Sequence, residues 1–298
     1  MRRKNCSVCC GRKRCKSKTS RSRDMPHEAE KRRASRRVTR LLIDCPPRGA
    51  TQPVVCAWII YLLTFWCLGV SCSHECWAGD FKVAIDIGNT RNSPGAISAR
   101  GVPEYLFNKT IGTLIYQNLL KDKRFKGSFI INETGDDLSL SARAAIANSQ
   151  GAALLVSIHH DSVEPKDLSY WTYKGEILPH CDKFTGYSIF YSEKNGNPLK
   201  SLIFAVILGS EMLGNGFCPT LHHAEKFTGG DKDFIDKIRG IYEYNSLVVL
   251  KKTNMPSVLF ECGIIKNKYD ELQLSNPEYQ HKIANTIVIA IKKYSANY

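Results

Sequence analysis

The stretch that decides the fold reads AALLVSIHHD and spans Ala152–Asp161. Its apolar part is short and continuous, which is typical of a strand buried on both faces of a sheet. Directly upstream, the sequence predicts a helix over Ser139–Gln150, because Ser139 can cap its first turn and Gly151 can end its last one. A helix that leads straight into a buried strand indicates an α/β domain.

The same alternation continues along the rest of the chain. Short apolar runs predict further strands at 81–86, 127–132, 186–191, 246–250 and 257–261. Apolar residues at helical spacing predict helices at 103–119, 198–213 and 277–294. Residues 162–185 show no clear period and are predicted to form a long loop. We therefore expect a sheet covered by helices on both faces, with residues 80–298 forming a single domain.

The basic charge of the chain is concentrated at its N-terminus. The formal net charge is +14, but residues 1–50 hold 17 Lys and Arg against 4 Asp and Glu, whereas the remainder holds 25 against 24. Blocks of like charge usually stay solvated, so residues 1–53 are predicted to form a disordered basic arm. An arm that binds nucleic acid or an anionic membrane is the alternative interpretation.

An apolar segment follows this arm. Residues 54–70 read VVCAWIIYLLTFWCLGV and carry no charge. A basic region, an apolar run and then small residues form the order of a secretory signal peptide, here over residues 54–78. An uncleaved membrane anchor is the alternative, since the run reaches the lower length limit for a span. Both interpretations place residues 80–298 outside the cytoplasm, in the periplasm or cell envelope, and argue against nucleic acid as a partner.

Four polar residues stand where a site would form. Asn89, His159 and Glu261 lie at or just past the ends of predicted strands, and Glu104 lies in the first turn of a helix. In α/β sheets, residues at the carboxyl ends of strands line the ligand crevice. Zinc hydrolysis needs three protein ligands, an open position for water and a nearby general base. Because His and Glu supply suitable ligand atoms, the pattern indicates one zinc site.

Read together, these residues resemble the zinc-dependent N-acetylmuramoyl-L-alanine amidases of bacterial cell-wall turnover. That family opens with a strand and an Asp-Pro-Gly-His-like turn, which Asp86-Ile-Gly-Asn89 fills here. Its second ligand is a Glu that starts a helix, as Glu104 does, and its third lies in a Ser-Ile-His stretch that ends here at His159. An Arg-x4-Asn pattern starts at Arg143, and a Pro-x-Val-Leu run precedes Glu261. The resemblance covers residues 81–298.

The resemblance implies a fold, a reaction and a role for each residue. The fold would be a mixed, mostly six-stranded sheet flanked by helices. The reaction would be hydrolysis of the amide between N-acetylmuramic acid and L-alanine, so the partner would be peptidoglycan or its muropeptide fragments. Glu104 and His159 would bind zinc, and Glu261 would act first as general base and then as general acid.

Position 89 departs from the family pattern, because an amide stands where a histidine ligand is expected. Three interpretations remain open. Asn89 ligates weakly through its oxygen, a neighbouring histidine replaces it, or the protein is a catalytically impaired relative that binds wall fragments. His160 is the nearest substitute, but adjacent strand residues point to opposite faces. His222 and His223 are predicted on a loop, either solvated or bordering the cleft.

Other residues near the predicted site have supporting interpretations. Asp86, Arg143, His160 and Asp161 are candidates for holding the ligands in place from behind. Cys262 follows Glu261 directly, but no histidine partner for a nucleophile is visible, so it is interpreted as a small buried residue. The pair Cys6-x-x-Cys9 in the arm lacks a second pair at finger spacing, so we expect no zinc finger there.

Overall fold

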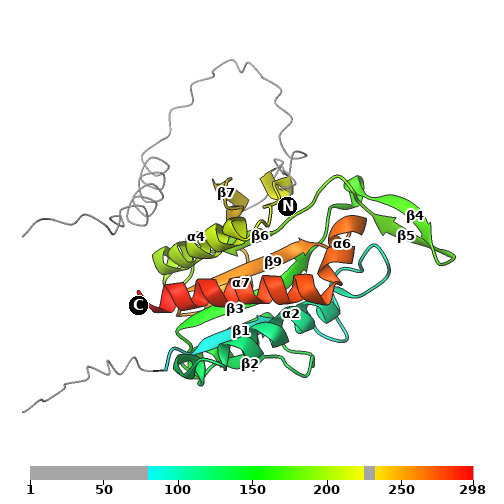
Figure 1. Ribbon diagram of the computed structural model, residues 1–298. Coiled ribbons are helices and arrows are strands. Elements are labelled where there is room, and N and C mark those ends of the chain that lie inside the picture. The colour runs from blue at the N-terminus through cyan, green and yellow to red at the C-terminus, as the bar shows by residue number, and fades with distance from the viewer. Residues whose placement is uncertain (1–79, 225–231, 298) are drawn as a thin grey trace, which may run out of the picture. The chain divides into compact units, whose positions relative to one another are not determined.

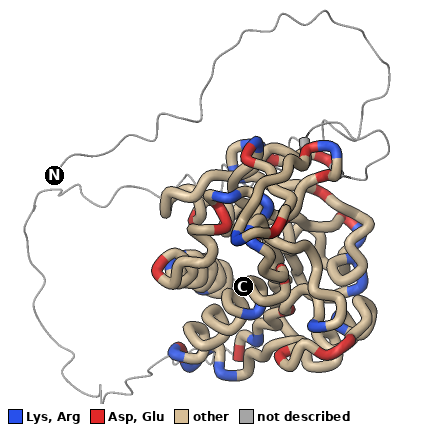
Figure 2. The backbone as a smooth tube through the Cα atoms, turned by 90° about the vertical axis from the view of Figure 1, so that its right-hand side faces the viewer, with Lys and Arg blue, Asp and Glu red and all other residues tan. Residues whose placement is uncertain are grey.

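The computed structural model describes residues 80–224 and 232–297 of the chain (Figure 1). The predictions for the basic arm 1–53 and the apolar segment 54–78 lie outside these ranges. None of the helices within them combines the length and the apolar character that a membrane span requires. In the view of Figure 2, basic and acidic residues are interspersed along the described part, as its near-balanced composition predicts.

A mixed sheet of seven strands, in the order β2-β1-β3-β9-β6-β8-β7, forms the centre of the domain. The first four strands in this order are parallel: β1 pairs with β2 and β3, and β3 pairs with β9. β6 runs antiparallel to β9 and parallel to β8, and β7 closes the edge antiparallel to β8. The strands are β1 Val83–Ile87, β2 Phe129–Ile131, β3 Leu154–Asp161, β6 Ser188–Tyr191, β7 Lys232–Asp236, β8 Ile241–Tyr244 and β9 Ser257–Ile264.

Helices cover both faces of this sheet, as predicted. On one face, α2 (Glu104–Leu119), α4 (Pro198–Gly214) and α7 (Pro277–Ser295) pack side by side (Figure 1). On the other face, α3 (Leu140–Ser149) packs against the short α5 (Val248–Lys252). Side chains from these two helices and from strands β1, β3 and β9 form one buried apolar cluster. The buried all-apolar pattern of β1 follows from this double coverage.

Three helix ends show how local sequence sets the boundaries. Ser139 caps α3, its side chain accepting a hydrogen bond from the backbone N–H of Ala142. Asn267 caps α6 (Lys268–Leu274), and Asn276 caps α7, which begins with Pro277. Side-chain oxygens of Ser and Asn satisfy backbone donors that the first turn leaves free. The prediction of a Ser139 cap is confirmed.

The structure corrects several predictions made from periodicity. The sheet has seven strands, where the resemblance implied a mostly six-stranded one. The strand predicted at 246–250 is wrong, because residues from Val248 onward form the helix α5. The predicted loop 162–185 contains a two-stranded hairpin, β4 Ser169–Tyr173 with β5 Glu176–His180. The hairpin is tied back to the domain because the Trp171 indole Nε1 donates to the carbonyl of Ala99 at 2.9 Å.

Two strands extend further than predicted, which changes where the candidate residues sit. β3 continues through His159 and His160 to Asp161, and β9 continues past Glu261 to Ile264. The candidate residues on these two strands therefore lie within the strands rather than beyond their ends. Because side chains alternate along a strand, His159 and His160 are placed on opposite faces.

Candidate metal centre and active site

The loop after β1 places Asn89 above the end of the strand. Asn89 adopts a left-handed backbone with φ of 66°, a conformation in which Asn is enriched. Its carbonyl accepts hydrogen bonds from Arg143 Nη2 at 2.6 Å and from Asn132 Nδ2 at 3.1 Å. The preceding Gly88 donates its N–H to the carbonyl of Ile158 at 3.0 Å. The backbone of residue 89 is thus fixed independently of its side chain.

A buried ion pair supports this loop from inside. Arg143 reaches from α3 to Asp86, with Nη1 2.7 Å from Oδ1, and both side chains are about fully buried. The same Nη1 donates to the carbonyl of Ile87 at 2.5 Å, and Ser157 Oγ donates to the other Asp86 oxygen at 2.7 Å. A buried charge pair is stable only when its remaining hydrogen-bonding positions are also filled, as they are here.

Glu104 stands at the first turn of α2 and faces His159. Its Oε1 lies 3.0 Å from His159 Nδ1 and accepts from Asn108 Nδ2 at 3.1 Å, while its Oε2 accepts from the Ala96 N–H at 3.1 Å. Burial of the carboxyl group works against ionisation, but the hydrogen bonds from His159, Asn108 and Ala96 outweigh it and lower the pKa of Glu104 to about 2. The carboxylate is therefore ionised and able to hold a cation.

Two glycines make room for these side chains. A Cβ on Gly88 would lie 2.3 Å from His159 Nε2. A Cβ on Gly95, which has φ of +78°, would lie 2.2 Å from both Asn89 Nδ2 and Glu104 Oε2. The Asn89 amide and the Glu104 carboxylate therefore both lie close to Gly95. Because Glu104 also faces His159, the side chains of Asn89, Glu104 and His159 are brought together.

The Asn89 side chain carries an unsatisfied atom at this point. Its Nδ2 is buried and has no hydrogen-bond partner among the residues that the structure describes. Unpaired buried polar atoms are rare and mark a missing ligand or a functional constraint. The nitrogen and oxygen of an amide are assigned from their partners, so turning the amide over would present Oδ1 here. The residues present thus fit a cation held by a carboxylate, an imidazole and a weaker amide oxygen.

Glu261 lies beside His159 on the neighbouring strand. His159 on β3 and Glu261 on β9 are partners in the parallel register, so their side chains share one face of the sheet. A cleft of about 600 Å³ opens on this face, between the sheet and the helices α3 and α5. Its wall includes Asn89, His159, Arg143, Leu140 and Leu259. Asn89 and His159 therefore line this cleft together with a partly apolar wall, and Glu261 lies on the same face of the sheet.

His160 takes no part in this arrangement. It is 1% exposed and packs against Phe107 of α2, with the ring centroids 5.4 Å apart. Its Nδ1 lies 2.8 Å from Asn108 Oδ1. Burial lowers the pKa of His160 to about 3, with the Glu104 charge opposing this and His159 adding to it. His160 is a neutral residue behind Glu104 and does not replace the ligand missing at position 89.

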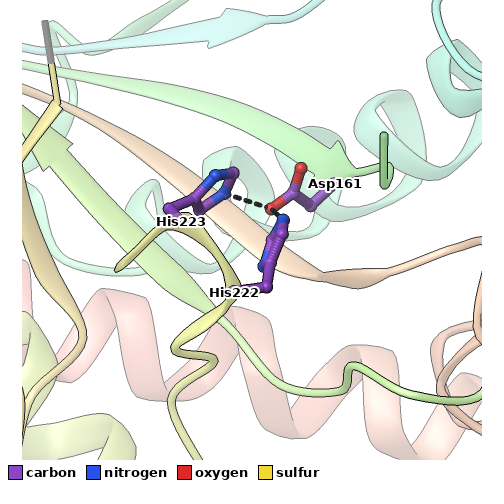
Figure 3. A group of neighbouring side chains, drawn as sticks. All are labelled: Asp161, His222 and His223. Carbon is purple, nitrogen blue, oxygen red and sulfur yellow. Dashed lines mark hydrogen bonds and ion pairs between the residues drawn. The ribbon is translucent and has the colours of Figure 1, made fainter. Parts of the chain in front are cut away.

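Asp161 and two histidines form a separate group (Figure 3). His223 Nε2 lies 2.6 Å and His222 Nε2 3.4 Å from Asp161 Oδ2. The sequence predicts His222 and His223 on a loop, either solvated or bordering the cleft, but their contact with Asp161 spans about sixty residues and could not be predicted. Two adjacent histidines in Leu221-His-His-Ala-Glu225 are the only sequence signal, and that signal is weak.

Cys262 has no catalytic role in this geometry. Its side chain is buried, and burial raises the pKa of the thiol well above its usual value, with the charges of Glu261 and Glu104 adding to the effect. A thiol kept protonated in this way is a poor nucleophile. The interpretation of Cys262 as a small buried residue agrees with this environment.

Comparison with known proteins matches the chain to one family. The family model described as N-acetylmuramoyl-L-alanine amidase (Amidase_3) matches residues 83–293. A putative N-acetylmuramoyl-L-alanine amidase of Buchnera aphidicola subsp. Acyrthosiphon pisum is 28% identical over 229 residues, covering 71% of this chain and 93% of the relative. The probable amidase AmiB of Haemophilus influenzae is also 28% identical, over 72% of this chain and 52% of its own length.

Solved structures share the fold. The amidase Ami1 of Mycobacterium smegmatis superposes with a TM-score of 0.57 at 22% identity, covering 74% of this chain and 99% of that one. At this level of identity the likeness concerns the fold. It includes the mixed sheet with helices on both faces described above.

Proposed function

The chain belongs to the N-acetylmuramoyl-L-alanine amidase family, and on that premise we propose that Glu104, His159 and Glu261 carry a zinc-dependent amide hydrolysis. The family identifies the chain as an amidohydrolase of peptidoglycan turnover, acting on the bond between N-acetylmuramic acid and L-alanine. Zinc and the roles of these residues are what the resemblance to the family implies, and the geometry of the site supports them.

One observation carries the proposal. Glu104 Oε1 and His159 Nδ1 face each other at 3.0 Å beside a buried amide nitrogen of Asn89 that has no partner. An ionised carboxylate and an imidazole nitrogen are common zinc ligands. Gly88 and Gly95 leave the space that these side chains need. The donor set therefore fits zinc at two positions and is weak at the third.

Glu261 is the proposed acid and base. Zinc, when bound, supplies an activated water and polarises the amide carbonyl. Glu261 stands on the same face as His159, one strand away, and is placed to take a proton from water and return it to the leaving amine. Its carboxylate lies outside the pair of ligands, as a general base must.

Arg143 and Asp86 act as positioning residues in this scheme. Arg143 holds the carbonyl of Asn89, and Asp86 fixes the guanidinium through Oδ1. Neither side chain reaches the facing pair of Glu104 and His159 by any hydrogen bond in the described part of the chain. Their effect on the reaction is therefore to set where residue 89 stands.

The cleft limits the substrate that this site takes. Its volume of about 600 Å³ is within the range of small-molecule sites. A muramic acid residue with the start of its stem peptide fits this scale better than several glycan units do. Leu138, Leu140 and Leu247 supply apolar wall, whereas Thr90 and Ser93 supply hydrogen-bonding groups. We propose a muropeptide or one wall unit as the segment recognised.

The test compares the natural protein with Asn89→His. Histidine is also enriched in the left-handed backbone that residue 89 adopts, so the variant fits the loop without new strain. We expect it to bind zinc at least about 10-fold more tightly than the natural protein, because even weaker perturbations of zinc sites cost about that much. Zinc affinity is measured by competition with a chelator, and amidase activity by release of stem peptide.

The outcomes separate two functions. If the natural protein releases stem peptide and Asn89→His releases it faster, the residue is a weak ligand in a working enzyme. If only the variant cuts, the natural chain is a catalytically impaired relative that binds peptidoglycan fragments. The amide at position 89 is the observation that supports this second function. If zinc affinity is unchanged by Asn89→His in a folded protein, the proposed metal site is wrong.

Action on peptidoglycan implies a place outside the cytoplasm. We propose that residues 54–78 direct export to the periplasm or cell envelope, as a signal peptide or as a membrane anchor. Mass spectrometry of the mature N-terminus decides between them. A chain that begins near residue 79 supports the signal peptide, and a chain that retains residues 54–70 in the membrane fraction supports the anchor.

A further inference from the structure

We propose that Asp161, His222 and His223 form a second binding site, for a divalent transition-metal ion, separate from Glu104 and His159. Their ligand atoms all lie within 4.8 Å of one another (Figure 3). Two imidazoles and one carboxylate form a ligand set that suits zinc and its neighbours in the first transition row. The proposal goes beyond the proposed function, because it uses none of the residues assigned there.

The three side chains are held away from water. The exposed fractions of the side chains are 7% for His222 and 11% each for His223 and Asp161. Solvated histidines on a surface loop would be far more exposed. The rings of His222 and His223 lie side by side, with centroids 3.7 Å apart, and both direct Nε2 at the same carboxylate oxygen. Two imidazoles that direct a ring nitrogen at the same carboxylate oxygen can share a metal ion with it.

A hydrogen bond from behind orients His222. Thr220 Oγ1 lies 3.1 Å from His222 Nδ1, so that Nε2 is turned toward Asp161. Thr220 is itself fixed, because its N–H donates to the carbonyl of Tyr187 at 2.7 Å and its carbonyl accepts from the Tyr242 hydroxyl at 3.0 Å. Metal-binding histidines are usually oriented in this way through the nitrogen that does not bind the metal.

The aromatic surroundings fix His223 and place the group relative to the cleft. The ring of His223 packs edge-on against Phe190 at 5.1 Å and against Tyr242 at 5.5 Å. Phe190 is the register partner of Leu259, which lies two residues before Glu261 on the same face of the sheet. The two histidines therefore stand near β6 on the face that Glu261 shares, and Asp161 reaches them from the end of β3. Glu104 lies at the start of α2, against His159.

Within residues 80–224 and 232–297, this arrangement gives one complete ligand set and one incomplete one. At the first site, Asn89 supplies an amide where zinc prefers imidazole. At the second, His222, His223 and Asp161 supply three good ligands and leave positions open for water or substrate. We therefore expect the second site to hold zinc more tightly than the first.

The experiment counts zinc in a background where the first site is disabled. The full chain carrying Glu104→Gln and His159→Gln is compared with the same protein carrying His223→Gln in addition. After equilibration with zinc and removal of free metal, we expect the added substitution to lower the zinc content by about one equivalent per chain. Zinc bound by the cysteines of residues 1–76 contributes equally to both proteins and cancels in the difference. His281→Gln, an exposed histidine on α7, is the matched control and leaves the content unchanged.

The results are decisive in either direction. An unchanged zinc content on adding His223→Gln, with a circular dichroism spectrum like that of the parent, overturns the second site. If His223→Gln unfolds, Asp161→Asn serves as the second variant. Cobalt then gives an independent readout in the parent carrying both first-site substitutions: visible d–d bands without thiolate charge transfer support the site, and their absence overturns it. Failure of the proposed function appears separately, as a zinc content that the first-site substitutions do not alter.

Discussion

Replacing His160 by glutamine is expected to remove much of the acid sensitivity of this domain. His160 is 1% exposed, and its Nδ1 lies 2.8 Å from Asn108 Oδ1. Glutamine does not titrate in this range and can donate to the same oxygen. The variant therefore tests the protonation of one buried side chain without creating an unpaired acceptor on Asn108.

The magnitude follows from the difference between the folded and unfolded pKa values. Burial lowers the pKa of His160 from 6.5 to about 3. Between these values the unfolded chain binds a proton at this residue and the folded chain does not, so the stability falls as the pH falls. From about pH 7 to about pH 5, this one residue should lower the free energy of unfolding by about 2 kcal/mol.

Urea unfolding at these two pH values, with a chelator present to exclude metal, measures the effect. All other groups titrate in both proteins, so the difference between the two pH decrements isolates His160. The natural chain and the exposed-site control His281→Gln should lose about 2 kcal/mol more than His160→Gln over this interval. If His160→Gln loses as much stability as the natural chain, His160 is protonated in the folded state and the packing argument is refuted.

Three other substitutions test the framework of the site. Gly95→Ala should lower zinc affinity and amidase activity by about 10-fold or more, since its Cβ would displace two ligand side chains; Gly151→Ala, also at positive φ but with open space around it, is the matched control and should leave both unchanged. Arg143→Met leaves Asp86 buried without its partner and should cost about 3–5 kcal/mol in urea unfolding; a loss below about 1 kcal/mol would contradict the buried pair. Ser139→Ala should cost about 1 kcal/mol of stability by removing the cap of α3, and an unchanged unfolding midpoint would refute that role.

The parts of the fold that could be predicted are those in which local sequence and tertiary position agree. β1 and β3 are apolar runs because both faces of the sheet are covered there. α3 and α7 carry their own capping residues. Asn89 and His159 then lie close together, because β1 and β3 are neighbouring parallel strands and both residues lie at the carboxyl ends of these strands.

The parts that could not be predicted depend on contacts made far along the chain. Val248–Lys252 has the composition of a strand, but it packs against α3 as a helix. Periodicity cannot separate the two for so short an apolar run. β7 reads KDFID, in which three of five residues are charged, as suits an edge strand, and no apolar run marks it. The hairpin β4–β5 is held by Trp171, whose partner Ala99 lies about seventy residues away.

The way in which the backbone of residue 89 is held connects the candidate site to the fold. The buried pair of Arg143 and Asp86, together with Asn132, fixes the backbone of this residue and makes no demand on its side chain. The side chain itself lies close to the Glu104 carboxylate, next to Gly95. On the zinc assignment proposed above, the backbone support for the third ligand is intact around an amide. The proposal therefore places the weakness of the site in a single side chain rather than in the scaffold.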